Sequence, residues 1–270
     1  MKKLLLLVIA VACLAGTLSA LAVTVDEDNQ YVIVETELYK IHWQKSGNMG
    51  YIKAFVEGSD ESIIGAAGRA FYHASKYADG WKDWSGLQEW EILEEAGGKA
   101  VVQYISKDAG NKVYTCVAHY HDSVTYIKHE VTVTADGADV TSFESDHEPQ
   151  FEVNMDVVGM QVFTQPFPHA VYWTENGFFG ALYGPDAESA GLQEWGGRNP
   201  GRLKLNHDNM GENLKDGESG TIVYYVAFGK GDEKDGNELA NEVQGEPPLG
   251  GAVSPVGSLT TTWAGIKSAK

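Results

Sequence analysis

Residues 31–56 read YVIVETELYKIHWQKSGNMGYIKAFV and contain three short runs in which apolar and polar side chains alternate. The runs are Tyr31–Glu35, Tyr39–Trp43 and Tyr51–Val56. Alternation with a period of two residues is typical of a strand that buries one face and exposes the other. A glycine-containing turn separates the second and third runs. This stretch therefore predicts three successive strands of a sandwich.

The same alternation recurs along the rest of the chain. Further strands are expected at residues 100–105, 112–120, 124–134, 150–153, 157–163, 170–174, 178–183, 202–205 and 221–228. Only Glu233–Val243 has the pattern of a helix. Because no helices separate the strands, parallel βαβ units are disfavoured. We therefore predict an all-β fold, a large antiparallel β-sandwich with one short C-terminal helix.

The first 22 residues have the pattern of a secretory signal peptide. Lys2 and Lys3 precede the apolar run LLLLVIAVA, which is shorter than the stretch of about 20 residues that a membrane helix requires. Small residues favour cleavage after Ala22 and a secreted protein, extracellular or periplasmic, with lipid anchoring at Cys13 as the alternative. We expect a β-sandwich domain over residues 23–244, a flexible linker and C-terminal tail over 245–270, and no transmembrane segment.

The formal net charge of −18 narrows the class of partner. Loss of Lys2 and Lys3 with the leader changes the net charge from −18 to −20. Nucleic acid and anionic membrane surfaces are poor electrostatic matches for such a chain. An anionic polysaccharide stays open as a ligand, because Arg69, Arg198, Arg202 and Lys204 can form a local basic site. Of the two cysteines, only Cys116 remains in the mature chain, so no intramolecular disulfide can form. Its place in an alternating run predicts a buried strand residue.

Two segments resemble a known family. The strand, strand, turn and strand of Tyr31–Val56 resemble the opening of galactose-mutarotase-like β-supersandwiches, which include aldose epimerases and the β-domains of polysaccharide lyases. Residues 213–218, NLKDGE, followed by the alternating TIVYYVAF, resemble the closing segment of the same superfamily. The resemblance implies a supersandwich and a carbohydrate-related role, as a polysaccharide lyase, a sugar epimerase or a binding protein.

The resemblance also implies catalytic residues. Glu194 in GLQEWGGR occupies a place comparable to that of the epimerase glutamate, which takes the anomeric hydroxyl proton. The histidine motif of the epimerases is missing, and His169 in QPFPHAVYW is the nearest substitute as the general acid. In a lyase, His169 or Tyr172 would be the base, and Arg198 would be the cation that stabilises the enolate.

The pentapeptide GLQEW occurs twice, ending at Trp90 and at Trp195. We interpret the two copies as equivalent loops in which the indole faces contact a sugar while Gln and Glu bind its hydroxyl groups. Neighbouring tryptophans extend this platform. The substrate-binding residues predicted on this ground are Trp81, Trp84, Trp90, Trp173 and Trp195. The alternative is that these tryptophans anchor loops to the core.

His119 and His121 are two residues apart, so they face the same side of a strand, and His129 and Glu130 follow on the next strand. Two histidines and a carboxylate can bind zinc or iron, but half-buried strands of this composition are more often structural, so no metal is predicted. The acidic residues at 144–152 lack the spacing of an EF-hand and are interpreted as solvated surface. We find no phosphate-binding glycine loop or nucleophile elbow, and no cofactor is predicted.

The sequence leaves three functional hypotheses open. The first is a carbohydrate-active enzyme, the second a carbohydrate-binding module without catalysis, and the third a structural or cell-surface β-sandwich. The predicted partner is a carbohydrate or polysaccharide, while the sugar, catalysis and the oligomeric state stay open. Aromatic residues on an open face favour binding, and complete burial of the tryptophans with no cleft favours a structural role.

Overall fold

A computed structural model describes most of the chain between residues 23 and 246. The described residues are 23–46, 50–65, 71–77, 80–83, 86–106, 110–140, 143–152, 157–195, 198–207 and 213–246. They form 17 strands and one helix, and all neighbouring strands pair antiparallel. The all-β fold class and the C-terminal helix are therefore confirmed. The predicted signal peptide and residues 247–270 of the predicted tail lie outside the described residues.

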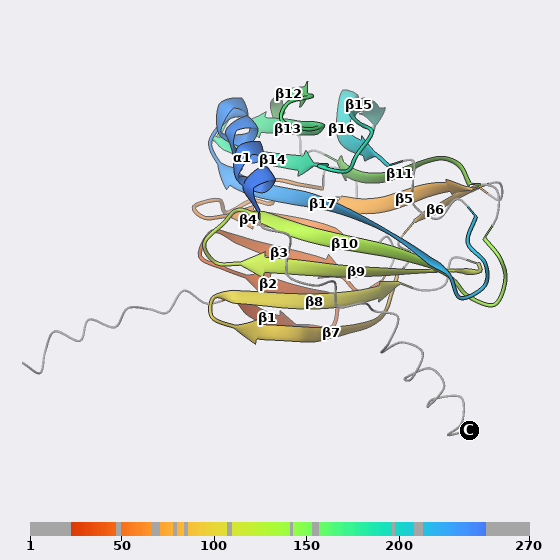
Figure 1. The fold of residues 1–270 in the computed structure, drawn as a ribbon. Coiled ribbons are helices and arrows are strands. Elements are labelled where there is room, and N and C mark those ends of the chain that lie inside the picture. Colours follow the sequence, from red (N-terminus) through yellow and green to blue (C-terminus); the bar gives the residue numbers. More distant parts are fainter. Residues whose placement is uncertain are drawn as a thin grey trace, which may run out of the picture.

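The strands form three sheets (Figure 1). The four-stranded sheet contains, in chain order, β1 (Thr24–Glu27), β2 (Tyr31–Glu35), β3 (Tyr39–Gln44) and β4 (Tyr51–Val56). The eight-stranded sheet contains, in spatial order, β12 (Val157–Phe163), β13 (His169–Thr174), β14 (Phe178–Tyr183), β17 (Ser219–Lys230), β10 (Tyr126–Ala135), β9 (Lys112–His121), β8 (Lys99–Ser106) and β7 (Leu87–Ala96). The five-stranded sheet contains β15 (Ser189–Trp195), β16 (Arg198–Asn206), β11 (Phe143–Glu152), β5 (Phe71–Tyr77) and β6 (Gly80–Asp83).

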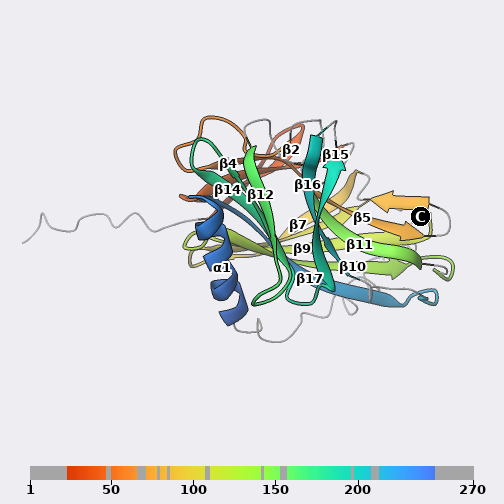
Figure 2. The same ribbon diagram turned by 90° about the horizontal axis from the view of Figure 1, so that it is seen from above.

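One continuous apolar core joins the three sheets. Its buried side chains include Trp43 of the four-stranded sheet, Tyr104 of the eight-stranded sheet and Leu203 of the five-stranded sheet. Figure 2 shows β2 and β4 on the opposite side of the molecule from β10 and β17. The four-stranded sheet therefore packs face to face on the eight-stranded sheet, as in a sandwich. Cys116 is buried in this core, as the sequence predicts.

Helix α1 (Glu233–Gly245) covers β13 and β14 on the side away from the main core. It starts with a capping box, in which Asp232 accepts a hydrogen bond from the backbone of Lys234 and Asp235 accepts one from the backbone of Asp232. Its buried face, which includes Leu239 and Val243, forms a second apolar cluster with the outer face of the eight-stranded sheet. The helix therefore closes this face locally.

The sequence misses several strands, and the GLQEW segments are the clearest case. The two copies were predicted as loops, which is wrong, because Leu87–Ala96 is strand β7 and Ser189–Trp195 is strand β15. Each is an edge strand of its sheet. Nearly all of β7 is exposed on both faces, and a strand that buries neither face has no reason to alternate. Its many glutamates also protect the open edge from pairing with another chain.

We predict that Gly236→Ala destabilises the protein although alanine favours helices. A Cβ atom at Gly236 would lie 2.5 Å from Cγ1 of Val171, so α1 would have to move away from β13. The expected loss is about 1–3 kcal/mol in the free energy of unfolding, measured by urea denaturation. The control is Gly245→Ala in the same helix, where the added Cβ meets no atom within 4 Å. Equal stability of the two variants would contradict close packing of α1.

Candidate functional site

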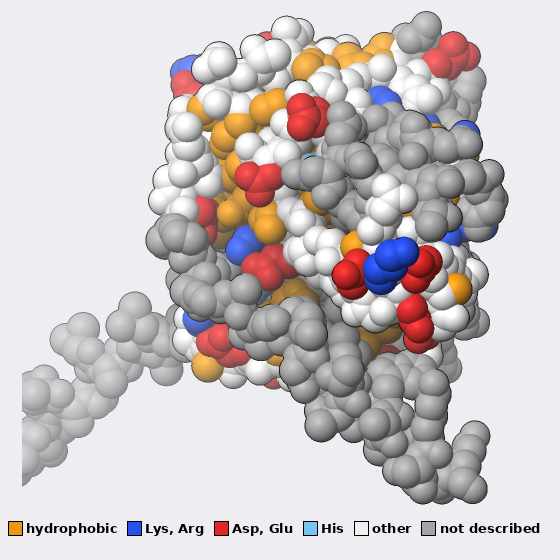
Figure 3. Space-filling view, turned by 45° about the vertical axis from the view of Figure 1, so that its right-hand side comes forward, with side chains coloured by type: hydrophobic (Ala, Val, Ile, Leu, Met, Phe, Trp, Pro, Cys, Tyr) orange, Lys and Arg blue, Asp and Glu red, His pale blue; other side chains and the backbone are white. Residues whose placement is uncertain are grey.

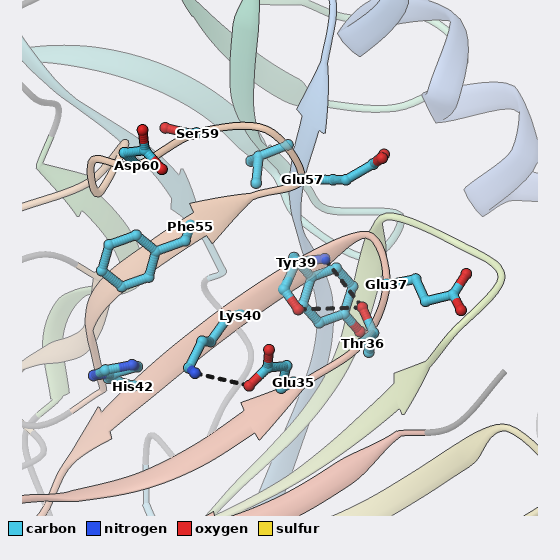
Figure 4. Close-up of a pocket in the computed structure, with 11 residues that line it drawn as sticks. Glu35, Thr36, Glu37, Tyr39, Lys40, His42, Phe55, Glu57, Ser59 and Asp60 are labelled. Carbon is cyan, nitrogen blue, oxygen red and sulfur yellow. Dashed lines mark hydrogen bonds and ion pairs between the residues drawn. The ribbon is translucent and has the colours of Figure 1, made fainter. Parts of the chain in front are cut away.

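A depression of about 520 Å³ lies on the outer face of the four-stranded sheet, where the turns after β2 and β4 meet (Figure 4). Polar and charged side chains from both turns surround a floor of aromatic and apolar groups. The residues that line it are Glu35, Thr36, Glu37, Tyr39, Lys40, His42, Phe55, Val56, Glu57, Ser59 and Asp60. Eight of these eleven residues are polar or charged, and Tyr39, Phe55 and Val56 supply the aromatic and apolar part.

Three rings form an aromatic row across the outer face of the four-stranded sheet. The ring centroids of Tyr31 and His42 are 5.1 Å apart, and those of His42 and Phe55 are 5.5 Å apart. The strand period explains why these side chains point outward, because Tyr39, Ile41 and Trp43 of β3 are buried and the residues between them are not. The aromatic row therefore takes the positions of the sheet that normally hold polar side chains.

His42 is neutral at neutral pH. Burial in this row lowers the pKa of His42, and the positive charges of Lys53 and Lys40 lower it further. Neither ring nitrogen has a hydrogen-bond partner among the described residues. In Figure 4 the ring lies beside that of Phe55. Both ring nitrogens are themselves buried, so His42 contributes a flat face rather than a hydrogen-bonding group.

The rim of the depression is built on ordered turns. The hydroxyl of Thr36 accepts hydrogen bonds from the backbone of Leu38 (3.1 Å) and Tyr39 (3.0 Å) and donates one to the Tyr39 carbonyl (3.2 Å). The hydroxyl of Tyr39 donates to the carbonyl of His121 in the eight-stranded sheet (3.2 Å). A ligand therefore meets a rim that is already fixed, which reduces the ordering cost of binding.

Four carboxylates border the depression, and two of them form ion pairs. Glu35 lies 2.7 Å from the ammonium group of Lys40, and Glu57 lies 2.9 Å from that of Lys230. Glu37 and Asp60 have no ion-pair partner within the described part of the chain. Because burial keeps His42 neutral, the depression has a net negative charge.

Basic side chains elsewhere on the surface are often paired as well. Lys215 lies 2.7 Å from Asp139, and Lys99 lies 3.0 Å from Glu94. On the face drawn in Figure 3, several Lys and Arg side chains lie directly beside acidic ones. Such pairing leaves little positive potential for a polyanion, in keeping with the acidic composition.

A second group of ring side chains lies at the centre of the core. This central cluster consists of Tyr51, His73, His129, His207 and Tyr224, all of them buried and drawn from all three sheets or their ends. The Tyr224 ring lies nearly parallel to the rings of His129 (11°, 5.4 Å) and His73 (14°, 6.0 Å). No group of three or more potential ligands in the described chain has metal-binding geometry.

Hydroxyl groups extend the central cluster into a buried polar chain. The Tyr51 hydroxyl lies 2.6 Å from Nε2 of His129 and 3.1 Å from the hydroxyl of Tyr120, which lies 2.9 Å from that of Tyr104. Burial lowers the pKa of His129 to about 3 and raises the pKa of Tyr51. All of these groups are therefore neutral at neutral pH, and the chain connects the sheets rather than meeting a ligand.

The structure does not bring His169 and Tyr172 together, because they point to opposite faces of β13. His169 is buried beneath α1, where its Nδ1 lies 2.8 Å from the carbonyl of Phe167 and its Nε2 lies 2.9 Å from the side chain of Asn237. Tyr172 is buried in the main core and donates a hydrogen bond to the carbonyl of Ile63 (2.8 Å). Both side chains therefore have structural partners.

The other two residues predicted as catalytic lie on the edge of the five-stranded sheet. Glu194 is exposed on β15, and the backbone of Arg198 pairs with that of Trp195. The side chains of Arg198 and Trp195 are outside the described atoms. Catalytic roles for Glu194 and Arg198 stay predictions.

The predicted tryptophan platform is spread over different sheets. Trp81 on β6 is 52% exposed, Trp90 is half-buried against the main core, and Trp173 is half-buried beside the cluster under α1. Trp84 lies outside the described residues. In the second GLQEW copy, Gln193 accepts a hydrogen bond from Nε of Arg202 (3.0 Å). Trp81 is the one tryptophan of the described set that is largely exposed.

His119, His121 and Glu130 face outward from the eight-stranded sheet, while His129 points into the core. Glu130 lies 3.5 Å from Nε2 of His119 and 2.6 Å from the ammonium of Lys128. The contacts with His119 and Lys128 lower the pKa of Glu130 to about 2. This arrangement is an ion-pair network on the outer face of the sheet.

The comparisons with known proteins place the fold. No protein-family model and no curated protein matches the chain. Among solved structures, the galactosidase domain of an alpha-galactosidase–sucrose kinase aligns with 11% identity and a TM-score of 0.53 over 78% of this chain. The chain spans 42% of the length of that structure. The likeness shows the fold, one found in a carbohydrate-active enzyme domain.

Two further structures align less closely. A heparan sulfate lyase from Pedobacter heparinus has 9% identity and a TM-score of 0.46 over 80% of this chain and 36% of its own. A putative aldose 1-epimerase from Escherichia coli K12 has 9% identity and a TM-score of 0.40 over 78% of this chain and 99% of its own. The resemblance to galactose-mutarotase-like supersandwiches is confirmed at the level of the fold. No helix described for this chain has both the length and the apolar character to cross a bilayer.

Sequence reasoning misses Tyr31, His42 and Phe55. The prediction relied on tryptophans in expected loops, whereas these rings lie on strands. A signal was present in the same alternation that predicts the strands, because aromatic residues fill outward positions in three neighbouring runs. The pairing of β2, β3 and β4 in the fold brings these outward rings into one row.

We predict that acid destabilises the fold through His129. The pKa is about 6.5 in the unfolded chain and about 3 in the folded protein, so between these values the unfolded state binds more protons. Above pH 6.5, His129 is neutral in both states and does not lower the free energy of unfolding. Below this pH, the free energy of unfolding falls by roughly 1 kcal/mol per pH unit as the pH drops toward 3. Urea denaturation at several pH values between these two pKa values should show this decrease in the free energy of unfolding.

The variant His129→Gln should reduce this slope even if the protein is less stable at every pH. The control is His121→Gln, since His121 is only half-buried and its pKa is less constrained by the core. The same slope in wild type and in His129→Gln would show that the central cluster does not control acid stability.

Proposed function

We propose that this chain is a carbohydrate-binding protein and that the depression on the four-stranded sheet is its ligand site. The observation that carries the proposal is the aromatic row of Tyr31, His42 and Phe55 beside a rim of carboxylate and hydroxyl groups. Flat rings pack against the C–H faces of pyranoses, and carboxylates accept hydrogen bonds from sugar hydroxyl groups.

The shape of the site supports an extended ligand. The aromatic row crosses three adjacent strands of one sheet. Two of its rings, His42 and Phe55, line the depression (Figure 4). An open strip accommodates an internal stretch of a polysaccharide, whereas a closed pocket selects a single sugar or a chain end. A polymer or oligomer is therefore the expected ligand.

The fold is compatible with a carbohydrate role, but the proposal rests on the site and not on the fold. A likeness at 11% identity to a galactosidase domain shows the architecture alone, and function depends on the site. Lyase or epimerase chemistry needs an acid, a base and a charge-stabilising group at one sugar. His169 and Tyr172, the two alternatives for the base, are both buried and hydrogen-bonded within the fold, so we propose binding rather than turnover.

Export is part of the proposal. The basic and apolar pattern of residues 1–22 supports secretion, with Val23 as the first mature residue, directly before β1. A secreted protein would meet extracellular polysaccharide without a transport step.

We predict that Phe55→Ala weakens glycan binding by about five- to tenfold, through loss of a ring face worth about 1 kcal/mol or slightly more. A glycan array identifies a ligand, and titration calorimetry then measures the affinity. Because Phe55 is half-buried on the outer face of the sheet, the variant should remain folded, which denaturation can check.

The control for this experiment is Trp81→Ala, which removes a larger and more exposed ring from the five-stranded sheet. We expect Trp81→Ala to bind the glycan with unchanged affinity and Phe55→Ala to bind it more weakly. The reverse pattern would move the site to the tryptophans, and binding to no glycan at all would favour the structural hypothesis.

A further inference from the structure

The depression has a net negative charge, which bears on the class of sugar that it can bind. Of the four carboxylates that line it, Glu35 and Glu57 are neutralised by Lys40 and Lys230. Glu37 and Asp60 are not neutralised by any described cation. These two come from different turns, one after β2 and one after β4, so they border the depression from two directions (Figure 4).

An anionic sugar polymer would therefore meet repulsion at this site. A uronate carboxylate or a sulfate group beside Glu37 or Asp60 would face a like charge. Lys40, the one lysine in the described lining of the depression, is paired with Glu35, and burial lowers the pKa of His42. Lys53 is exposed but lies outside this lining, where its ammonium is 5.6 Å from the centroid of Tyr31. The lining itself therefore has no spare cation to bind an acidic sugar.

An ammonium group has favourable contacts in the same place. Its three N–H donors match carboxylate oxygens, and a cation next to the face of Phe55 is attracted by the ring. Another ring of the aromatic row already holds a cation in this way, because the ammonium of Lys53 lies 5.6 Å from the centroid of Tyr31. Carboxylates and aromatic faces side by side are the groups that recognise an organic amine.

We infer that the depression selects sugars that carry amine groups, such as glucosamine units, and rejects uronic and sulfated sugars. The inference rests on the proposed function, and it adds the class of sugar. The aromatic row provides affinity for any pyranose face, while Glu37 and Asp60 provide the preference for positive charge.

The test compares three oligomers of equal length at about pH 6, where the amines carry protons and the carboxylates are ionised. They are oligoglucosamine, oligo-N-acetylglucosamine and oligogalacturonate. The expected order of affinity is oligoglucosamine, then the neutral oligomer, with oligogalacturonate weakest. Raising the salt concentration should weaken oligoglucosamine binding and leave the neutral oligomer nearly unchanged.

The isosteric variants Glu37→Gln and Asp60→Asn should each lower the affinity for oligoglucosamine by about two- to fivefold, as expected for exposed charges. The affinity for the neutral oligomer should not change. The control is Glu175→Gln, an exposed carboxylate in the turn between β13 and β14, which removes the same charge far from the depression along the chain.

The outcomes separate the inference from the proposed function. Binding of the neutral oligomer that depends on Phe55, with no preference for oligoglucosamine or with tighter binding of oligogalacturonate, overturns the inference and leaves the proposed function standing. An equal effect of Glu175→Gln and of the two site variants would also overturn the inference, since general charge would then explain the preference. Binding of none of the three overturns both.

Discussion

The contact between the Tyr51 hydroxyl and His129 is the constraint on which the structure depends, because it joins the four-stranded sheet to the eight-stranded sheet inside a fully buried core. A buried polar group without a partner would cost about 1–3 kcal/mol, so the two strands must keep a register that satisfies both groups. Stacking of Tyr224 on His129 and His73 extends the same constraint to the five-stranded sheet. The three sheets are separate hydrogen-bonded units, and these side-chain contacts hold them in one arrangement.

The candidate site follows from this arrangement. Tyr51 is on β4, and the same strand carries Phe55 on its outer face. On β3, Trp43 stacks on Tyr104 of the eight-stranded sheet with centroids 3.8 Å apart, which fixes the orientation of His42 next to it. Inward contacts thus decide which side chains point outward. The aromatic row is displayed by a rigid sheet, and its rim is held by turns that are already hydrogen-bonded.

The sequence predicts most of the strands that bury one face, and the strands that it misses include both the exposed β7 and the largely buried β5. Tyr31–Glu35 and Tyr51–Val56 match the observed strands because alternation records the boundary between core and solvent. Strand β7 has no such boundary, so its glutamates and Trp90 resemble a loop. His169 shows a different limit, because its burial depends on Asn237, 68 residues away in the chain, and no local pattern records such a contact. The outward aromatic positions were visible in the sequence, but only the pairing of β2, β3 and β4 brings them together.

The central claim is that a carbohydrate binds on the outer face of the four-stranded sheet. The most direct test is to identify an oligosaccharide that binds and to titrate it into the isotope-labelled protein while the backbone amide chemical shifts are followed by NMR. The account predicts the largest changes in Glu35–His42 and Phe55–Asp60, the two segments that form the depression. Changes confined to β6, β7 and β15, where Trp81, Trp90 and Glu194 lie, would contradict it.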